Sequence, residues 1–388
     1  MLPQEIVFEI LSKLPSKTLV RFRCVSKLFC AIIADHAFGV LNRSLSLTLP
    51  SRAGVLISIG SRTSYAPPRA YYTLNFTPRR RGMLQANRVA HFDGKYFLCS
   101  SSSDGLFICV SKPDRDFTVC NVRTGQRIFL PRFVQYRDCA LLLGFDSESK
   151  RYKVLMSSCL SRKMIPTGHE YKHWVFTVGV DKTWREISNY CSLPFFPFEG
   201  FCCHYSNTCV YIDDVIYSYN SLVKDNMIPR NYIVAFEVGC ESFSVITLPK
   251  KVSTIAYFDY FLKKSALLEI GGRLAIVRVP KLGGGECLYY MNVWTWEKSK
   301  ECWEEITMTI PLKWSRMISN ARLLRFATNH DGEIVLLCIY REKFSILICN
   351  LKSEVWRKFD VSGVEDFPIF SYWDVTIHNF VDHVFPLE

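Results

Sequence analysis

The sequence lacks any apolar run long enough to cross a bilayer. Its longest runs, such as 209–212 and 334–339, have the length of a β-strand, whereas a membrane-spanning helix needs about 20 consecutive apolar residues. The first residues, Met-Leu-Pro-Gln-Glu, contain neither the basic nor the apolar segment of a secretory signal. We therefore expect no membrane association, and we expect the chain to reside in the cytoplasm, the nucleus or both.

Motifs that carry metal, redox or phosphate chemistry are also missing. The 16 cysteines are spread over 388 residues without one Cys-x-x-Cys pair, which argues against a zinc ribbon and a redox motif and favours reduced thiols. The glycines at 283–285 are not followed by Lys and Ser or Thr, and no Gly-x-Ser-x-Gly is present. The sequence thus predicts no metal site, no cofactor and no catalytic residues.

One segment does match a catalytic pattern. Residues 169–173 read His-Glu-Tyr-Lys-His, and zinc proteases use His-Glu-x-x-His on a helix to place two ligands on one face. Here Pro166 and Gly168 precede the pattern and a β-prone run starts at Trp174, so no helix is expected. We therefore expect no metalloprotease.

Acidic residues are scarce in one window of the chain. The formal net charge is +12, and residues 51–100 contain eight Lys or Arg but a single acid. Within this window Arg79, Arg80 and Arg81 form a run that we expect to lie in an exposed turn. They are candidate contacts for an acidic target protein, although such runs are often simply solvated. Few aromatic residues flank the run, so nucleic-acid binding is not favoured.

The first 41 residues have the periodicity of short helices. Apolar residues recur every four positions from residue 2 to residue 14, Pro15 then ends the helix, and Ser26 can cap a later one that carries Ile32 and Ile33. Three short helices in about forty residues bury only a small core. We therefore expect this unit to complete its core against a partner.

These residues resemble the F-box, especially its plant form. The resemblance is carried by Leu2-Pro3-x-Glu5, by 9–19, by 21–27 and by the isoleucines at 32–33. It implies docking on a Skp-type adaptor and, through it, on a cullin. The resemblance assigns these positions to the helical core or to the adaptor surface: Leu2, Pro3, Ile6, Ile10, Leu11, Leu14, Pro15, Leu19 and Val25. Phe29 stands where a Trp is usual, which predicts weaker but retained adaptor binding.

From residue 45 onward the pattern changes to short β-prone runs separated by turns. Candidate hairpin turns, spaced 56, 64, 58 and 60 residues apart, are Asp93-Gly94, Ser149-Lys150, Asp213-Asp214, Gly271-Gly272 and Asp331-Gly332. A second hairpin follows each turn and ends on a large apolar residue, namely Ile128, Trp184, Phe243, Trp303 and Trp356. Two hairpins per repeat predict the four-stranded blade of a β-propeller, with the three tryptophans largely buried.

Five such repeats extend over about residues 88–360. The strand-like segments available to build a sixth, ring-closing blade are 45–49, 55–59, 71–76 and 375–384. The predicted fold is therefore mainly β with a small α unit, namely a three-helix domain at 1–44 followed by a propeller-like domain of about six blades at 45–388. A two-sheet sandwich would show similar alternation and remains an alternative.

The β region also resembles a known module. Asp104-Gly105-Leu106-Phe107, residues 143–155 and residues 175–179 resemble the plant F-box-associated domain, most closely its third type. Together the two resemblances imply a non-catalytic substrate-recognition subunit of an SCF-type ubiquitin ligase, which binds an unknown target protein through its β-domain. The alternative is a carbohydrate- or nucleic-acid-binding propeller with a helical cap.

Overall fold

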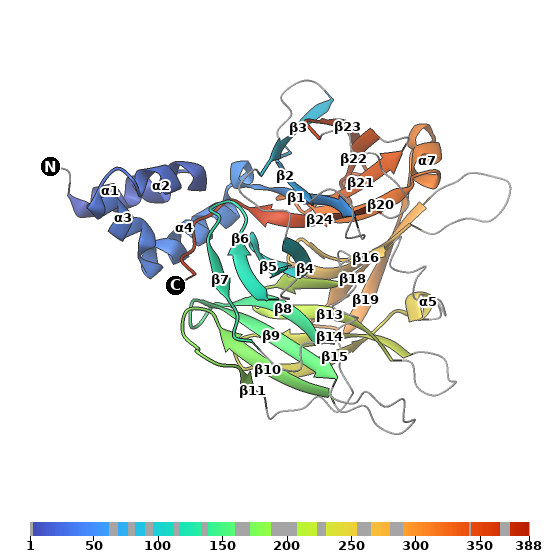
Figure 1. Cartoon of the computed structure of the whole chain (residues 1–388). Helices are drawn as coiled ribbons and strands as arrows, with labels where there is room; N and C mark the ends of the chain where they lie inside the picture. Colours follow the sequence, from blue (N-terminus) through green and yellow to red (C-terminus); the bar gives the residue numbers. More distant parts are fainter. Residues whose placement is uncertain are drawn as a thin grey trace.

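The chain forms a small helical unit that projects from one side of a ring of twisted β-sheets (Figure 1). In the computed structural model the described residues are 3–61, 69–76, 82–89, 96–111, 116–132, 139–159, 171–187, 208–222, 230–253, 265–279, 290–340, 343–364 and 373–387. The C-terminal end of the chain returns to the helical unit (Figure 1).

The N-terminal unit contains four helices rather than three, namely α1 (Gln4–Ser12), α2 (Ser16–Phe22), α3 (Lys27–Ala34) and α4 (His36–Thr48). The expected cap of α3 is confirmed, because the Ser26 hydroxyl oxygen accepts a hydrogen bond from the Phe29 amide at 3.1 Å. The prediction of a strand at 45–49 was wrong, because α4 continues through most of that segment. The boundary expected after residue 44 falls inside α4.

Six four-stranded antiparallel units form the ring, the last two of them joined into one sheet. In blades 1 to 5 the first strand in chain order faces the centre. Blade 1 contains β4 (Tyr96–Ser103), β5 (Leu106–Ser111), β6 (Phe117–Asn121) and β7 (Arg127–Phe129). Blade 2 contains β8 (Cys139–Asp146), β9 (Arg151–Cys159), β10 (Tyr171–Thr177) and β11 (Arg185–Glu186). Blade 3 contains β12 (Cys209–Ile212), β13 (Val215–Leu222), β14 (Arg230–Glu237) and β15 (Ser242–Thr247).

Blades 4 and 5 follow in the same way, and short helices lie between some of the elements. Blade 4 contains β16 (Ser265–Ile270), β17 (Arg273–Arg278), β18 (Tyr290–Glu297) and β19 (Cys302–Thr309). Blade 5 contains β20 (Leu323–Thr328), β21 (Ile334–Tyr340), β22 (Lys343–Cys349) and β23 (Trp356–Ser362). The short helices are η1 (Pro50–Arg52), α5 (Lys250–Ser253) and α7 (Leu312–Ser319).

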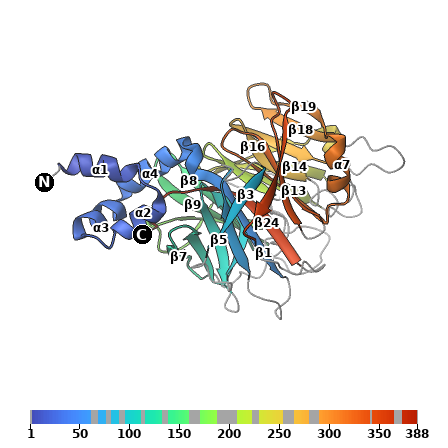
Figure 2. The same cartoon turned by 90° about the horizontal axis from the view of Figure 1, so that it is seen from above.

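Blade 6 is built from both ends of the chain. Its innermost strand is β24 (Trp373–Val381), followed outward by β1 (Ala53–Ser61), β2 (Ala70–Leu74) and β3 (Met83–Arg88). Strand β24 pairs with β1 along the full length of both strands, and β3 also pairs in parallel with β23 of blade 5. Figure 2 shows this seam from above. The prediction of a sixth, ring-closing blade is confirmed, and the sandwich alternative was wrong.

Four of the five predicted hairpin turns join the first and second strands of a blade. They are the turns at 149–150, 213–214, 271–272 and 331–332. In blade 1 the turn between the first and second strands lies at Asp104 and Gly105, with φ of 49° and 89°. Asp93-Gly94 lies outside the described residues. Asp and Gly are the residues that tolerate positive φ, so the true turn carried the same kind of signal.

The tryptophans at the repeat ends occupy equivalent positions, at or beside the outermost strands. Trp184, Trp303 and Trp356 are half-buried, however, and the prediction that they are largely buried was wrong. For Trp184 and Trp303 the outermost strand has a neighbouring strand on one side only, so part of each ring stays in contact with solvent. Strand β23, which begins at Trp356, also pairs with β3, but only at residues 360–362. The indole N–H of Trp184 donates to the Pro131 carbonyl at 2.8 Å, and that of Trp303 donates to the Thr247 carbonyl at 2.7 Å. These tryptophans therefore also tie their blade to the preceding one.

Within the described segments, no single helix is both long and apolar enough to cross a membrane. Helices α3 and α4 reach that length and hydropathy only when counted together, and a bend of 68° separates them.

Candidate functional site

The helical unit exposes several apolar side chains that a protein partner could cover. Among the residues predicted for the adaptor site, Ile6 and Ile10 of α1 are 43% and 50% exposed, and Val25 before α3 is 63% exposed. Pro3 and Pro15 are also exposed. Several exposed apolar side chains on one small helical unit are candidates for contact with a protein partner.

Other predicted site residues serve the interior of the unit instead. Leu11 and Leu19 are buried, and Leu14 is half-buried against the same cluster. Leu2 lies outside the described residues. The prediction did not say which of these positions lie in the helical core and which lie on the surface. In the structure the leucines described here belong to the core, whereas Pro3, Ile6, Ile10, Pro15 and Val25 are exposed.

The sequence reasoning missed Leu28, which is 49% exposed at the start of α3. Its neighbour Phe29 is half-buried and packs against Phe22, with ring centroids 5.8 Å apart. Leu28 is the second helical residue after the capping Ser26, and its exposed position in the first turn carried no signal in the sequence. The exposed side chains of Ile6, Ile10, Val25 and Leu28 are together called the helical apolar surface below.

Helix α4 fixes the helical unit on the ring through a buried arginine. The Arg43 guanidinium pairs with the Asp104 carboxylate in the first hairpin of blade 1. Its Nε also donates to the Tyr152 hydroxyl at 3.1 Å, and its Cζ lies 3.6 Å from the centroid of the Phe145 ring. Burial raises the pKa of the Tyr152 hydroxyl, which therefore stays neutral. One side chain thus joins α4 to blades 1 and 2.

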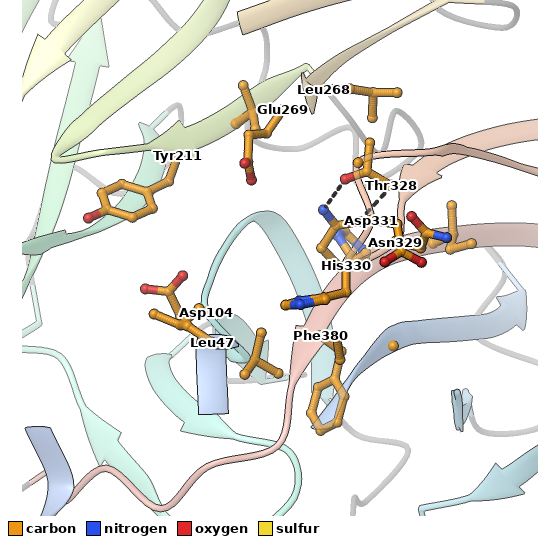
Figure 3. Close-up of a pocket in the computed structure, with 18 of the residues that line it drawn as sticks. Leu47, Asp104, Tyr211, Leu268, Glu269, Thr328, Asn329, His330, Asp331 and Phe380 are labelled. Carbon is orange, nitrogen blue, oxygen red and sulfur yellow. Dashed lines mark hydrogen bonds between the residues drawn. The ribbon is translucent and has the colours of Figure 1, made fainter. Parts of the chain in front are cut away.

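The centre of the ring opens into a pocket of about 430 Å³ on the side of the helical unit. Asp104, Tyr211, Glu269, Leu47 of α4 and Phe380 of β24 are among the residues that line it (Figure 3). Burial raises the pKa of Glu269, and the nearby charges of Asp213 and Asp104 raise it further. The residues that the structure describes include no group of three His, Cys, Asp or Glu placed to hold a metal ion.

The His-Glu-x-x-His segment does not form a helical metal site in its described part. Residues from Tyr171 onward belong to β10, and His173 is buried with its Nδ1 2.9 Å from the Ser157 hydroxyl. Burial lowers the pKa of His173 to about 4, so the ring is neutral at physiological pH. His169 and Glu170 lie outside the described residues. The expected strand after the pattern is confirmed.

The opposite face of the ring is the one turned away from α1 to α4. Helix α7 follows the outermost strand of blade 4 and lies on that side (Figure 1). It exposes Leu312 at 69% together with Lys313 and Arg316, while Ser315 and Ile318 are buried. Sequence reasoning missed this basic and apolar helix, because its amphipathic pattern covers only about two helical turns between two strong strands. Arg79, Arg80 and Arg81 lie outside the described residues, and their role stays a prediction.

Two family models match this chain. The model described as the F-box domain matches residues 1–41. The model described as the F-box associated beta propeller domain matches residues 72–384. The two matches coincide with the helical unit and with most of the ring.

Curated relatives and solved structures show further similarity. An F-box protein of Arabidopsis thaliana is 26% identical, with 96% of this chain and 89% of the relative covered. A second F-box protein of that plant is 27% identical over 94% of this chain and 90% of the relative. TolB from Acinetobacter baumannii is a solved structure similar to this chain, with a TM-score of 0.46, 10% identity, and 91% and 73% of the two chains covered.

Proposed function

This chain belongs to the F-box proteins that carry an F-box associated beta propeller domain, and we propose that it is the substrate-recognition subunit of an SCF-type, cullin-RING ubiquitin ligase. The observation that carries the proposal is the helical apolar surface on an F-box that is fixed to a closed six-bladed ring. A Skp-type adaptor would cover that surface and connect the chain to a cullin.

In this proposal the two faces of the ring have different roles. The helices occupy one face, whereas α7 lies on the opposite face, which would meet a target protein (Figure 1). Leu312, Lys313 and Arg316 offer that target an apolar contact beside two positive charges. Such a complex would act in the cytoplasm, the nucleus or both.

No acid, base or nucleophile of this chain is required by the proposal. A receptor that holds a target beside a ubiquitin-charged enzyme raises the effective concentration of the target's lysines, and the gain comes from proximity and orientation. The pocket at the ring centre is assigned no step in this process.

The test is capture of a purified Skp-type adaptor by the full chain, compared between two variants of matched exposure. Ile10 and Val355, in the turn between β22 and β23, are 50% and 51% exposed. Covering the free half of an Ile side chain is worth about 1–2 kcal/mol, or about tenfold in affinity, and a buried Asp adds a desolvation cost. We expect Ile10→Asp to weaken adaptor binding at least tenfold and Val355→Asp to leave it unchanged. Equal binding by both variants, or none by the wild-type chain, would contradict the proposed function.

A further inference from the structure

The C-terminal tail, residues 382–387, is buried over its whole length although it forms no helix or strand. His383 and Val384 are 0% and 4% exposed, and Phe385 and Leu387 are each 2% exposed. Terminal residues are usually poorly packed unless something ties them down. Six consecutive buried residues therefore indicate that this tail has a structural partner.

Part of that partner is the F-box itself. The Val384 side chain belongs to the same core cluster as Leu11, Leu19 and Phe38. The Val384 amide donates to the Asn42 side-chain oxygen at 3.0 Å, and the Asn42 amide group in turn donates to the Ser12 carbonyl of α1 at 2.9 Å. The tail therefore supplies one side chain to the F-box core and one hydrogen bond to its frame.

Two further contacts fix the tail against the helices. The Ser16 hydroxyl at the start of α2 donates to the Asp382 carboxylate. Gly39 of α4 faces Pro386 so closely that a Cβ on this glycine would lie 2.2 Å from the proline Cδ. The tail and the helices thus pack without space for one additional methyl group.

The other part of the partner is the ring. The Asn121 amide group of blade 1 donates to the His383 carbonyl at 3.0 Å. The Phe385 ring packs edge-on against Tyr152 and Phe145 of blade 2, with centroids 4.9 Å and 6.0 Å apart. Leu387 belongs to the same blade 2 cluster. Val384 therefore packs into the F-box core, while Phe385 and Leu387 pack into the apolar cluster of blades 1 and 2.

The position of the tail depends on closure of the ring. Residue 382 directly follows β24, the strand that completes blade 6 by pairing with β1. The pairing ends at Val381, opposite Ala53, and the Asp382 amide continues it by donating to the Arg52 carbonyl at 2.9 Å. If β24 were not in place, the tail would have no fixed path to the F-box core.

We propose that Val384 is a positioning residue for adaptor docking, and that this F-box holds its adaptor-binding form only when the C-terminal strand has closed the ring. The inference rests on the proposed function. Leu11 and Leu19 support α1 and α2 from the side on which Val384 packs, and Ile6 and Ile10 are carried by the same α1. A chain with an incomplete or open ring would then fail to recruit the ligase.

The test compares three substitutions in the full chain. Val384→Asp places a charge in the F-box core, Leu387→Asp places the same charge three residues later against blade 2, and Val384→Ile keeps the apolar contact. We expect Val384→Asp to weaken binding of a purified Skp-type adaptor at least tenfold, while Leu387→Asp and Val384→Ile stay within threefold of the wild type. The folding of the ring is followed in each variant by near-ultraviolet circular dichroism and by its melting temperature.

If Val384→Asp does not yield folded protein, Val384→Ala serves instead, with an expected loss of at least threefold. Wild-type adaptor affinity in Val384→Asp, or in the Val384→Ala that replaces it, would overturn the inference. An equal loss in that variant and in Leu387→Asp would overturn it as well. Failure of the proposed function looks different, because the wild-type chain itself would then not bind the adaptor.

Discussion

Replacing Arg43 with Met should show how strongly the joint between the F-box and the ring depends on one buried ion pair. The side chains of Arg43 and Asp104 are 10% and 13% exposed, so Arg43→Met leaves a largely buried carboxylate without its cation. Breaking a buried pair in this way costs about 3–5 kcal/mol. We expect a loss near 3 kcal/mol in the free energy of unfolding, because Met keeps part of the packing on the Phe145 ring.

A double-mutant cycle with Asp104→Asn separates this pairing from general packing. The Asn side chain carries no charge that needs a cation, so the double variant should be more stable than the two single losses predict, by about 1.5–3 kcal/mol. Urea denaturation followed by circular dichroism measures each free energy. The control cycle uses Arg132 and Asp116, an ion pair at 2.9 Å whose arginine is 79% exposed, where we expect less than about 1 kcal/mol. Additive losses at Arg43 and Asp104, within about 0.5 kcal/mol, would refute a joint based on this pair.

Three further predictions concern the ring. Gly105→Ala should destabilise the chain by about 2 kcal/mol or more, because φ is +89° and the new Cβ would meet the Val381 carbonyl oxygen at 2.3 Å. The control Gly272→Ala, with positive φ but no atom within 4 Å of the new Cβ, should cost about 1 kcal/mol. Equal losses of stability in urea melts would argue against the close approach at Gly105. Trp303→Ala should lower the free energy of unfolding by about 2–3 kcal/mol, less than the 3–5 kcal/mol of a fully buried aromatic residue, since the indole ring is half-buried. A loss of about 5 kcal/mol would show that the ring behaves as a fully buried core residue. Burial lowers the pKa of His173 to about 4 from 6.5, so the unfolded state binds more protons than the folded state between these pH values. The free energy of unfolding should therefore fall as the pH drops from about 6.5 to 4, by roughly 2–3 kcal/mol for this residue. His173→Phe should make that dependence on pH less steep, and an unchanged slope in melts from pH 7 to pH 4.5 would show that His173 is not the responsible group.

The ring could be predicted from the sequence because each blade repeats the same local requirements. A turn residue that tolerates positive φ must follow the innermost strand, and a large apolar residue must end the second hairpin. Both signals recur at a nearly constant spacing along the chain. The number of blades could therefore be predicted even though the turn of blade 1 at Asp104 and Gly105 was not recognised. The degree of burial of Trp184, Trp303 and Trp356 carried no such signal, because it depends on how far the neighbouring blade reaches across each ring.

Helix α4 and the tail could not be predicted for a different physical reason. Residues 45–49 read Leu-Ser-Leu-Thr-Leu, a strict alternation that is typical of a strand, yet 45–48 are helical because Arg43, Asn42 and Gly39 of the same helix find partners on the ring and the tail. Tertiary contacts outweigh such a weak local preference. In the tail, no periodicity marks six residues that are buried against two different domains.

The joint between the two domains is encoded at opposite ends of the chain, and this explains how so small an F-box can be stable. A three-helix unit of about forty residues buries too little apolar surface on its own, which led us to expect a partner for its core. The partner within this chain is its own C-terminus, since Val384 joins the core cluster and Asn42 ties it to α1. The exposed residues Ile6, Ile10 and Val25 are not covered by this contact, so the tail does not cover the proposed adaptor surface. The chain therefore completes the inner side of its F-box by itself and leaves the outer side for another protein.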